Sequence, residues 1–339
     1  YSVCYKPYGL IISITFQRQA KDIMHNEKND MAIIERFELM LANNELYFFD
    51  VEEFERIAEH YFNVGQFNEA ISTIQMARSQ HPLAAAFPLK HAQYLVTLDK
   101  LEEAAIELDF AEGLDPFNIE LTIARATIFS KKGFHGKAVK LLKELLNSTQ
   151  DVADIYALLA IEYQSMGDFG EAIKYLKKVL NEFPEDDVAM YNIALCYDSL
   201  EEPQNSIDYF KQFIDANPYN ELAWYHLGIM HGKLKQYKLA VKALEYSLLV
   251  DEQFTAAYYE IARMYERQED FEKAAETYVR SFEFDDPTGY IYYKLGHCYL
   301  QLNKTKQALR YFKRAVHEDD ELDEAYLEMA AIEVLDGKI

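Results

Sequence analysis

The chain has 339 residues, half of them hydrophobic, with only 12 Gly and 8 Pro and a formal net charge of −23. This composition favours an ordered, mainly helical protein over a disordered or all-β one. The acidic excess argues against nucleic acid and anionic membrane surfaces as partners, because both require clustered Lys and Arg. We interpret acidic runs such as residues 318–321 as solvated helix ends. The sharper alternative is a bias towards basic partners.

Three cysteines, Cys4, Cys196 and Cys298, are too few for a disulfide framework. Cys196 and Cys298 lie three periods apart in the repeat described below, so we expect small buried side chains that are too distant to bridge. This usage fits a reducing compartment. Cytoplasm is therefore the default location, with a periplasmic or envelope-associated protein as the alternative.

Residues 1–30 do not follow the repeat and are predicted to form an N-terminal arm. Its apolar run from Leu10 to Phe16 is too short to span a membrane, and no convincing signal cleavage site follows. The chain starts at Tyr1, with Met24 and Met31 as other candidate starts. The sequence therefore leaves open whether residues 1–23 are native.

Residues 31–50 are predicted to form a half-repeat that caps the N-terminal end of an array. Apolar residues recur there at helical spacing, including Ile33, Ile34, Phe37 and Leu41. Subtracting one period of the repeat from the next segment places this stretch where a second helix would fall.

From residue 51 the chain repeats every 34 residues without an insertion. Steps of 34 from Ala240 reach only small residues: Ala70, Ala104, Ala138, Ala172, Ser206, Ala274 and Ala308. The predicted repeats start at Val51, Ala85, Ile119, Ala153, Asp187, Glu221, Thr255 and Gly289. The first helix of a repeat has a large residue, a Leu or Ile, and a small residue at positions 4, 7 and 8, as in Tyr258, Ile261 and Ala262. These positions share one helical face and predict a packing stripe.

Turn residues separate the two predicted helices of each repeat. Gly65, Gly133 and Gly167 stand where a helix C-cap requires positive φ. Four prolines end second helices: Pro82, Pro116, Pro184 and Pro218. The second and third repeats depart most from the pattern, with His91 and Arg125 where aliphatic residues are usual.

The stretch 221–254 shows the pattern in full. Trp224, Leu227 and Gly228 have the spacing W-x2-L-G, and Ala240 and Leu244 have the spacing A-x3-F, with Leu in place of Phe. This resembles the tetratricopeptide repeat family. The resemblance implies an all-α, right-handed superhelical solenoid of antiparallel helix pairs. It implies eight repeats over residues 51–322 and the first helix of a truncated ninth over residues 323–339.

No catalytic or ligand-binding motif stands out. His226 and His231 lack the spacing that puts two ligands on one helix face, and no glycine-rich phosphate loop or nucleophile elbow is present. We therefore predict no metal, no cofactor and no enzyme activity.

The resemblance places positions 2, 5, 6, 9, 12 and 13 of each first helix on a concave surface. Position 5 is tyrosine in four consecutive repeats, with polar residues beside it. The predicted partner-binding residues are Tyr191, Asn192, Tyr225, His226, Tyr259, Glu260, Arg263, Tyr293 and Lys294. Such a column suits an extended peptide. The alternative is structural, because tyrosine is common at this position in the family and packs there against its neighbours.

The sequence thus predicts a non-catalytic scaffold that binds a peptide or helix of another protein in its groove. No three successive repeats carry the Lys, Asn and Arg set with which some family members clamp chaperone C-termini, so that role is disfavoured. Two alternatives stay open. One is a substrate-recruiting repeat arm of a longer enzyme, such as a glycosyltransferase. The other is a solenoid that self-assembles through its C-terminal end.

Overall fold

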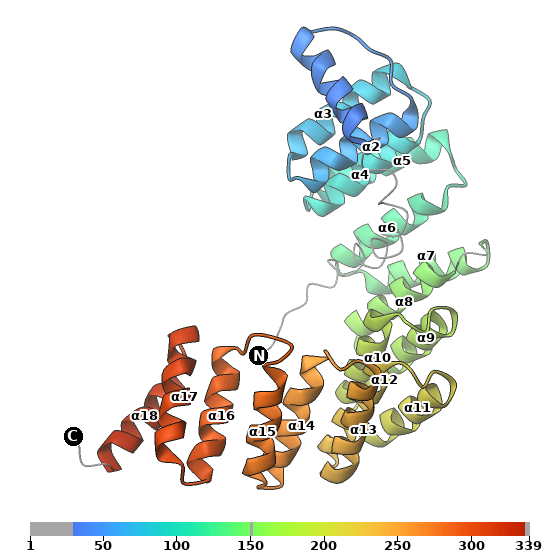
Figure 1. Cartoon of the computed structure of the whole chain (residues 1–339). Helices are drawn as coiled ribbons and strands as arrows, with labels where there is room; N and C mark the ends of the chain where they lie inside the picture. Colours follow the sequence, from blue (N-terminus) through green and yellow to red (C-terminus); the bar gives the residue numbers. More distant parts are fainter. Residues whose placement is uncertain (1–29, 150–151, 336–339) are drawn as a thin grey trace. The chain divides into compact units, whose positions relative to one another are not determined.

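The computed structural model describes residues 30–149 and 152–335, and every regular element in these ranges is a helix (Figure 1). The predicted N-terminal arm lies outside the described residues, apart from Asp30. So do the last four residues of the predicted ninth repeat. The chain forms two compact units, Tyr1–Glu182 and Phe183–Ile339.

The helices of the two units follow one another at regular intervals. In the first unit a helix over residues 30–43 precedes α2 (Val51–Asn63), α3 (Phe67–Gln80), α4 (Ala86–Thr97), α5 (Leu101–Leu114), α6 (Ile119–Lys131), α7 (His135–Leu146), α8 (Ala153–Ser165) and α9 (Phe169–Glu182). The second unit contains α10 (Asp187–Ser199), α11 (Pro203–Ala216), α12 (Glu221–Lys233), α13 (Tyr237–Val250), α14 (Thr255–Arg267), α15 (Phe271–Ser281), α16 (Gly289–Gln301), α17 (Thr305–Glu318) and α18 (Asp323–Leu335).

Within each unit, successive helices pack as antiparallel pairs, and each pair packs against the next (Figure 1). Side-chain caps set the start of several first helices. Asp50, Asn118, Asp186, Asn220 and Thr288 each accept a hydrogen bond from a backbone N–H in the first turn of the helix that follows. These caps satisfy N–H groups that the helix itself leaves unpaired.

The small residue that recurs every 34 residues lies where the two helices of a pair meet. All eight members of the series are 0% exposed: Ala70, Ala104, Ala138, Ala172, Ser206, Ala240, Ala274 and Ala308. The facing residue of the first helix is equally constrained. A Cβ added to Gly296 would lie 2.7 Å from the ring of Phe312 and 3.3 Å from the carbonyl oxygen of Ala308. The two helices therefore approach too closely for a larger residue at either position.

In the turn between the two helices of every pair, the residue at position 15 of the repeat has a left-handed backbone conformation. Its φ lies between 55° and 81° at Gly65, Asp99, Gly133, Gly167, Glu201, Lys235, Glu269 and Asn303. The expectation for the three glycines is confirmed. The turn at Lys235 has the two backbone hydrogen bonds of a Schellman motif. The N–H of Lys235 donates to the carbonyl oxygen of Gly232, and the N–H of Gln236 donates to the carbonyl oxygen of His231. The hydrogen bonds of the turn thus hold a non-glycine residue at positive φ.

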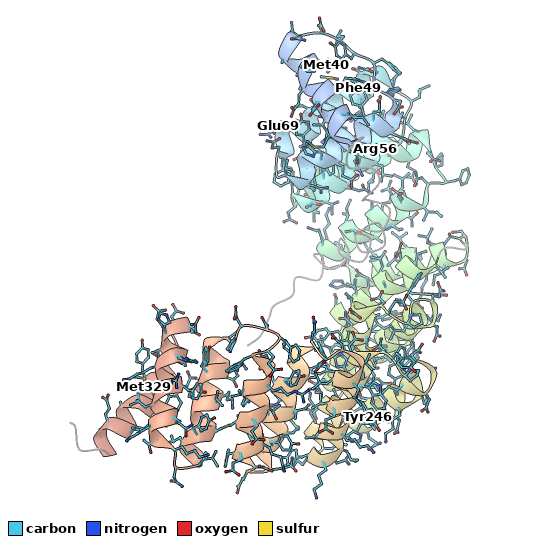
Figure 2. The ribbon with its side chains drawn as sticks, viewed as in Figure 1. Met40, Phe49, Arg56, Glu69, Tyr246 and Met329 are labelled. Carbon is cyan, nitrogen blue, oxygen red and sulfur yellow. The ribbon has the colours of Figure 1, made fainter. Side chains whose placement is uncertain are left out.

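The helix over residues 30–43 packs against α2. Phe37 and Met40 from this helix are buried with Phe49 and Phe54, and the rings of Phe37 and Phe49 lie 5.5 Å apart at a steep angle. Figure 2 labels Met40 and Phe49 in this part of the first unit. We retain residues 31–50 as a proposed half-repeat cap.

Cys196 and Cys298 are both buried, as expected from the sequence. Within the described ranges, none of the helices combines the length and apolarity needed to cross a membrane.

Ser206 is the one serine at this otherwise alanine position, and we expect it to lower the free energy of unfolding. Its hydroxyl is buried and has no hydrogen-bond partner among the described residues. We predict that Ser206→Ala raises the free energy of unfolding by about 1–2 kcal/mol, because it removes an unsatisfied buried polar group. Urea unfolding followed by circular dichroism measures the change. The reverse change Ala240→Ser is the control and is expected to destabilise, and a lower urea midpoint for Ser206→Ala would contradict the prediction.

Candidate functional site

The predicted partner-binding residues all lie in the second unit, on α10, α12, α14 and α16. Positions 2, 5, 6 and 9 of a helix share one face, and positions 4, 7 and 8 of the same helices pack towards the second helices. We call the side of α10, α12, α14, α16 and α18 that carries positions 2, 5, 6 and 9 the first-helix face. Interactions between neighbouring first helices bring several of the predicted residues together.

Tyr191 and Tyr225 flank His226 on this face. The ring of Tyr191 lies 6.1 Å from that of His226, and Tyr225 lies 5.5 Å from His226 and 5.1 Å from Phe254. Tyr191 is 49% exposed, whereas Tyr225 is partly buried. Burial raises the pKa of Tyr225 to about 12, and Glu260 adds to the rise while Arg263 opposes it. The Tyr225 hydroxyl therefore stays protonated at neutral pH and can donate a hydrogen bond.

His226 is only 5% exposed and stacks on Phe210, with 5.4 Å between the ring centres. Burial lowers its pKa to about 4, so the imidazole is neutral at neutral pH. Its Nε2 has no hydrogen-bond partner among the described residues. Such an atom is rare in a folded protein and marks a position where a hydrogen bond can be gained.

Glu260 and Arg263 pair with each other along α14. Their carboxylate and guanidinium lie 2.5 Å apart, although without the alignment of a hydrogen bond. Burial raises the pKa of Glu260, and Arg263 partly offsets this rise. Arg263 is half-exposed and remains accessible to a ligand from solvent.

Three of the predicted residues are occupied by contacts within the protein. Asn192 donates to the carbonyl oxygen of Val188 in its own helix at 2.8 Å. Tyr259 packs against the buried cluster around Tyr278. Tyr293 is partly buried, with its ring 5.9 Å from that of Phe312. The packing alternative therefore describes Tyr259 and Tyr293 better than it describes Tyr191.

Lys294 is bound to Glu266, a residue that the sequence analysis did not single out. Lys294 Nζ donates to Glu266 Oε2 at 3.0 Å, and the hydroxyl of Tyr278 donates to Oε1 at 3.0 Å. The thiol of Cys298 lies 3.8 Å from the same Oε1, and burial is the main reason its pKa rises to about 12. Glu266 thus joins α14, α15 and α16 beneath the first-helix face.

The structure adds exposed apolar side chains that the sequence analysis passed over. Leu195, Tyr290 and Leu327 lie at positions 9, 2 and 5 of α10, α16 and α18, and each is exposed. The positional rule already pointed to them. The prediction was built on the tyrosines of position 5 and the polar residues beside them, and it therefore left out apolar residues at the other positions.

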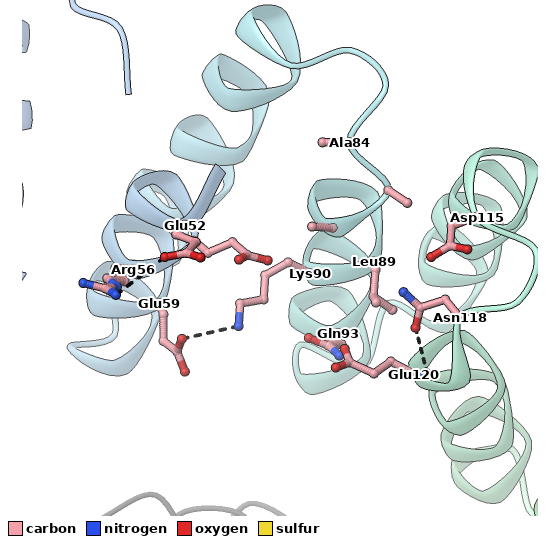
Figure 3. Close-up of a pocket in the computed structure, with 13 residues that line it drawn as sticks. Glu52, Arg56, Glu59, Ala84, Leu89, Lys90, Gln93, Asp115, Asn118 and Glu120 are labelled. Carbon is pink, nitrogen blue, oxygen red and sulfur yellow. Dashed lines mark hydrogen bonds and ion pairs between the residues drawn. The ribbon is translucent and has the colours of Figure 1, made fainter. Parts of the chain in front are cut away.

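The first unit has an open cavity of about 560 Å³ at the equivalent positions of α2 and α4, bordered by the turn before α6 and by Glu120 at the start of α6 (Figure 3). We call it the acidic cavity, after the carboxylates that line it: Glu52, Glu55, Glu59, Asp115 and Glu120. Figure 3 shows Glu59 and Lys90 pointing towards each other, with Nζ and Oε2 3.4 Å apart. Among the described residues of the chain, no group of three or more His, Cys, Asp or Glu side chains could hold a metal ion.

Comparison with known proteins identifies the repeat. A family model for the N-terminal tetratricopeptide repeat region of Psidin matches residues 130–249. Two further models, each described as a tetratricopeptide repeat, match residues 225–290 and 289–319. No curated protein matches the chain in sequence.

Several solved structures are similar. A tetratricopeptide repeat protein of Parabacteroides merdae is 19% identical, with 73% of this chain and 98% of that chain covered and a TM-score of 0.45. MamA of Desulfovibrio magneticus is 24% identical over 51% of this chain and 98% of its own, with a TM-score of 0.43. A thermophilic protein of Thermus thermophilus is 16% identical over 54% and 99%, with a TM-score of 0.41.

The Glu266–Lys294 pair yields a prediction about the support of this face. We expect a double-mutant cycle of Glu266→Ala and Lys294→Ala to give a coupling free energy of about 1 kcal/mol or more, because both side chains are largely buried. Urea unfolding of the four proteins measures it. The exposed pair of Arg280 and Glu252 in the same unit, 3.5 Å apart, is the control and should couple by less than about 0.5 kcal/mol. Additive effects of the Glu266 and Lys294 substitutions would refute the prediction.

Proposed function

The chain belongs to the tetratricopeptide repeat family, and we propose that it is a non-catalytic protein–protein interaction scaffold whose first-helix face binds a peptide or helix of another protein. The observation that carries the proposal is the exposure of large apolar side chains on this face. Tyr191 and Tyr290 are half-exposed, and Leu327 is more exposed still. Exposed apolar side chains that recur on one face of a protein are typical of an interaction surface.

Polar groups next to these side chains supply the means of orienting a partner. The half-exposed guanidinium of Arg263 is one, and the protonated hydroxyl of Tyr225 is another. Tyrosine offers a rigid apolar ring and a hydrogen-bonding group at little entropic cost, which suits the centre of an interface. The buried Nε2 of His226 offers a further hydrogen bond to a group that displaces the Tyr191 ring.

A second copy of the chain is one form that the partner can take. Tyr326, Leu327 and Val334 of α18 are exposed, and they are the side chains that self-association, left open as an alternative by the sequence, would cover. Association of two copies through such a face would follow the same rules as binding of another protein.

We predict that Tyr191→Ala/Tyr290→Ala weakens binding of the partner by about tenfold or more, because each substitution removes an aromatic contact from the interface. The partner is first captured from lysate with the wild-type chain and identified by mass spectrometry. Its affinity for each variant is then measured by isothermal titration calorimetry.

The matched control is Leu239→Ala/Leu249→Ala, which removes two exposed apolar side chains from the second helix α13. This variant should bind within about twofold of the wild type, since it leaves the first-helix face intact. Equal binding by the tyrosine variant and the wild type would place the interface elsewhere and overturn the proposal.

A further inference from the structure

The acidic cavity of the first unit has more negative charge than its own cations neutralise. Two basic side chains line it, and both are engaged. Arg56 pairs with Asp30 at 3.2 Å and with Glu52 at 3.9 Å, and Lys90 pairs with Glu59. Within the described ranges, the other three lining carboxylates have no ion-pair partner: Glu55, Asp115 and Glu120.

Glu55 is the carboxylate with the least favourable surroundings. Burial raises its pKa, Lys90 lowers it, and the charges of Glu120, Glu59 and Glu52 raise it further. Burial and the neighbouring carboxylates therefore both disfavour the ionised form of Glu55. A cation that enters the cavity would favour the ionised form and offset both effects.

The hydroxyl of Tyr94 in α4 is buried near two of the carboxylates that line the cavity. Its side chain is 5% exposed, and its hydroxyl has no hydrogen-bond partner among the described residues. The hydroxyl lies close enough to Glu59 and Glu55 for both charges to contribute to the rise in its pKa, although burial contributes most. Tyr94 does not itself line the cavity, and its ring stacks on Phe62. Its hydroxyl is therefore an unmet hydrogen bond in the packed core near the carboxylates.

Two exposed apolar residues directly precede residues that line the cavity. Leu83 is 83% exposed and precedes Ala84, which lines the cavity. Phe117 is 94% exposed and precedes Asn118, which also lines it. They come from the turns of two consecutive repeats. Because each is next to a lining residue in the sequence, both are available to a polypeptide that enters the cavity.

We propose that the acidic cavity binds an Arg or Lys side chain of a partner polypeptide, and that an apolar side chain of the same polypeptide packs on Leu83 and Phe117. The excess of carboxylates calls for a cation, and a cavity of about 560 Å³ is larger than a single ion needs. The apolar rim favours a polypeptide over a free polyamine. This site is separate from the first-helix face, and neither proposal depends on the other.

Fluorescence anisotropy with three synthetic peptides tests the proposal on the full chain at about 0.1 M salt, where long-range attraction to an acidic protein is largely screened. One peptide contains Arg, Leu and Gly. In the second, Glu replaces every Arg, and in the third, Ser replaces every Leu. We expect the first to bind best, the third about tenfold more weakly, and the second not at all. Failure of the Arg-Leu peptide to bind at about 1 mM protein, or spermine binding as well as the peptide, would overturn the proposal.

Substitutions locate the binding within the molecule. Glu55→Gln/Glu120→Gln should weaken binding of the Arg-Leu peptide by about tenfold or more. The variant should be at least as stable as the wild type in urea, because it removes repulsion around Glu55. The control Glu69→Gln/Glu103→Gln changes the net charge equally at two exposed sites on the second helices α3 and α5, and should bind within about twofold of the wild type. Equal effects of the two variants would show general attraction to an acidic surface and contradict the proposal.

Phe117→Ser tests the apolar rim. Its ring is almost fully exposed, so the substitution should leave the urea midpoint unchanged while it weakens binding of the Arg-Leu peptide by about fivefold or more. The Arg-Ser peptide should bind this variant and the wild type alike. An unchanged affinity for the Arg-Leu peptide would show that Phe117 does not contact the bound peptide. If Glu55→Gln/Glu120→Gln also left binding unchanged, the acidic cavity would not be the binding site.

Discussion

The close contact between the two helices of each pair is the constraint on which the rest of the structure depends. It requires a small residue on both sides, such as Gly296 against Ala308, and it recurs every 34 residues. Because it directs one face of each first helix inward, it leaves positions 2, 5, 6 and 9 on the opposite side, facing a neighbour or solvent. The residues available for function are thus selected by the packing.

Those positions carry different chemistry in the two units. In the second unit they present aromatic and aliphatic side chains, including Tyr191 and Tyr290. In the first unit the same positions of α2 and α4 form an acidic cavity around Glu55. A repeat fold permits this division because each repeat contacts only its neighbours, so one part of the array can change its surface without disturbing another.

The sequence predicted the family, the all-α solenoid and the left-handed turns at glycine, and these are confirmed. The sequence did not predict ion pairs between side chains that belong to different helices. Arg125 occupies a position where an aliphatic residue is usual, and its guanidinium lies 2.6 Å from Asp109 and from Glu112 on the preceding helix. Likewise, the side chain of Lys294 is held by Glu266 of the preceding first helix. The exposure of each tyrosine depends on which neighbour covers it, and a period alone does not contain that information.

If partners bind the first-helix face of the second unit, photo-crosslinking in cells should detect them there. A photoreactive residue is placed at Leu195 on that face or at Leu249 on the second helix α13, both of which are exposed. We expect a covalent adduct with a partner protein from the Leu195 position and none from Leu249. An adduct from Leu249 alone would contradict this expectation, because the binding surface would then be formed by the second helices.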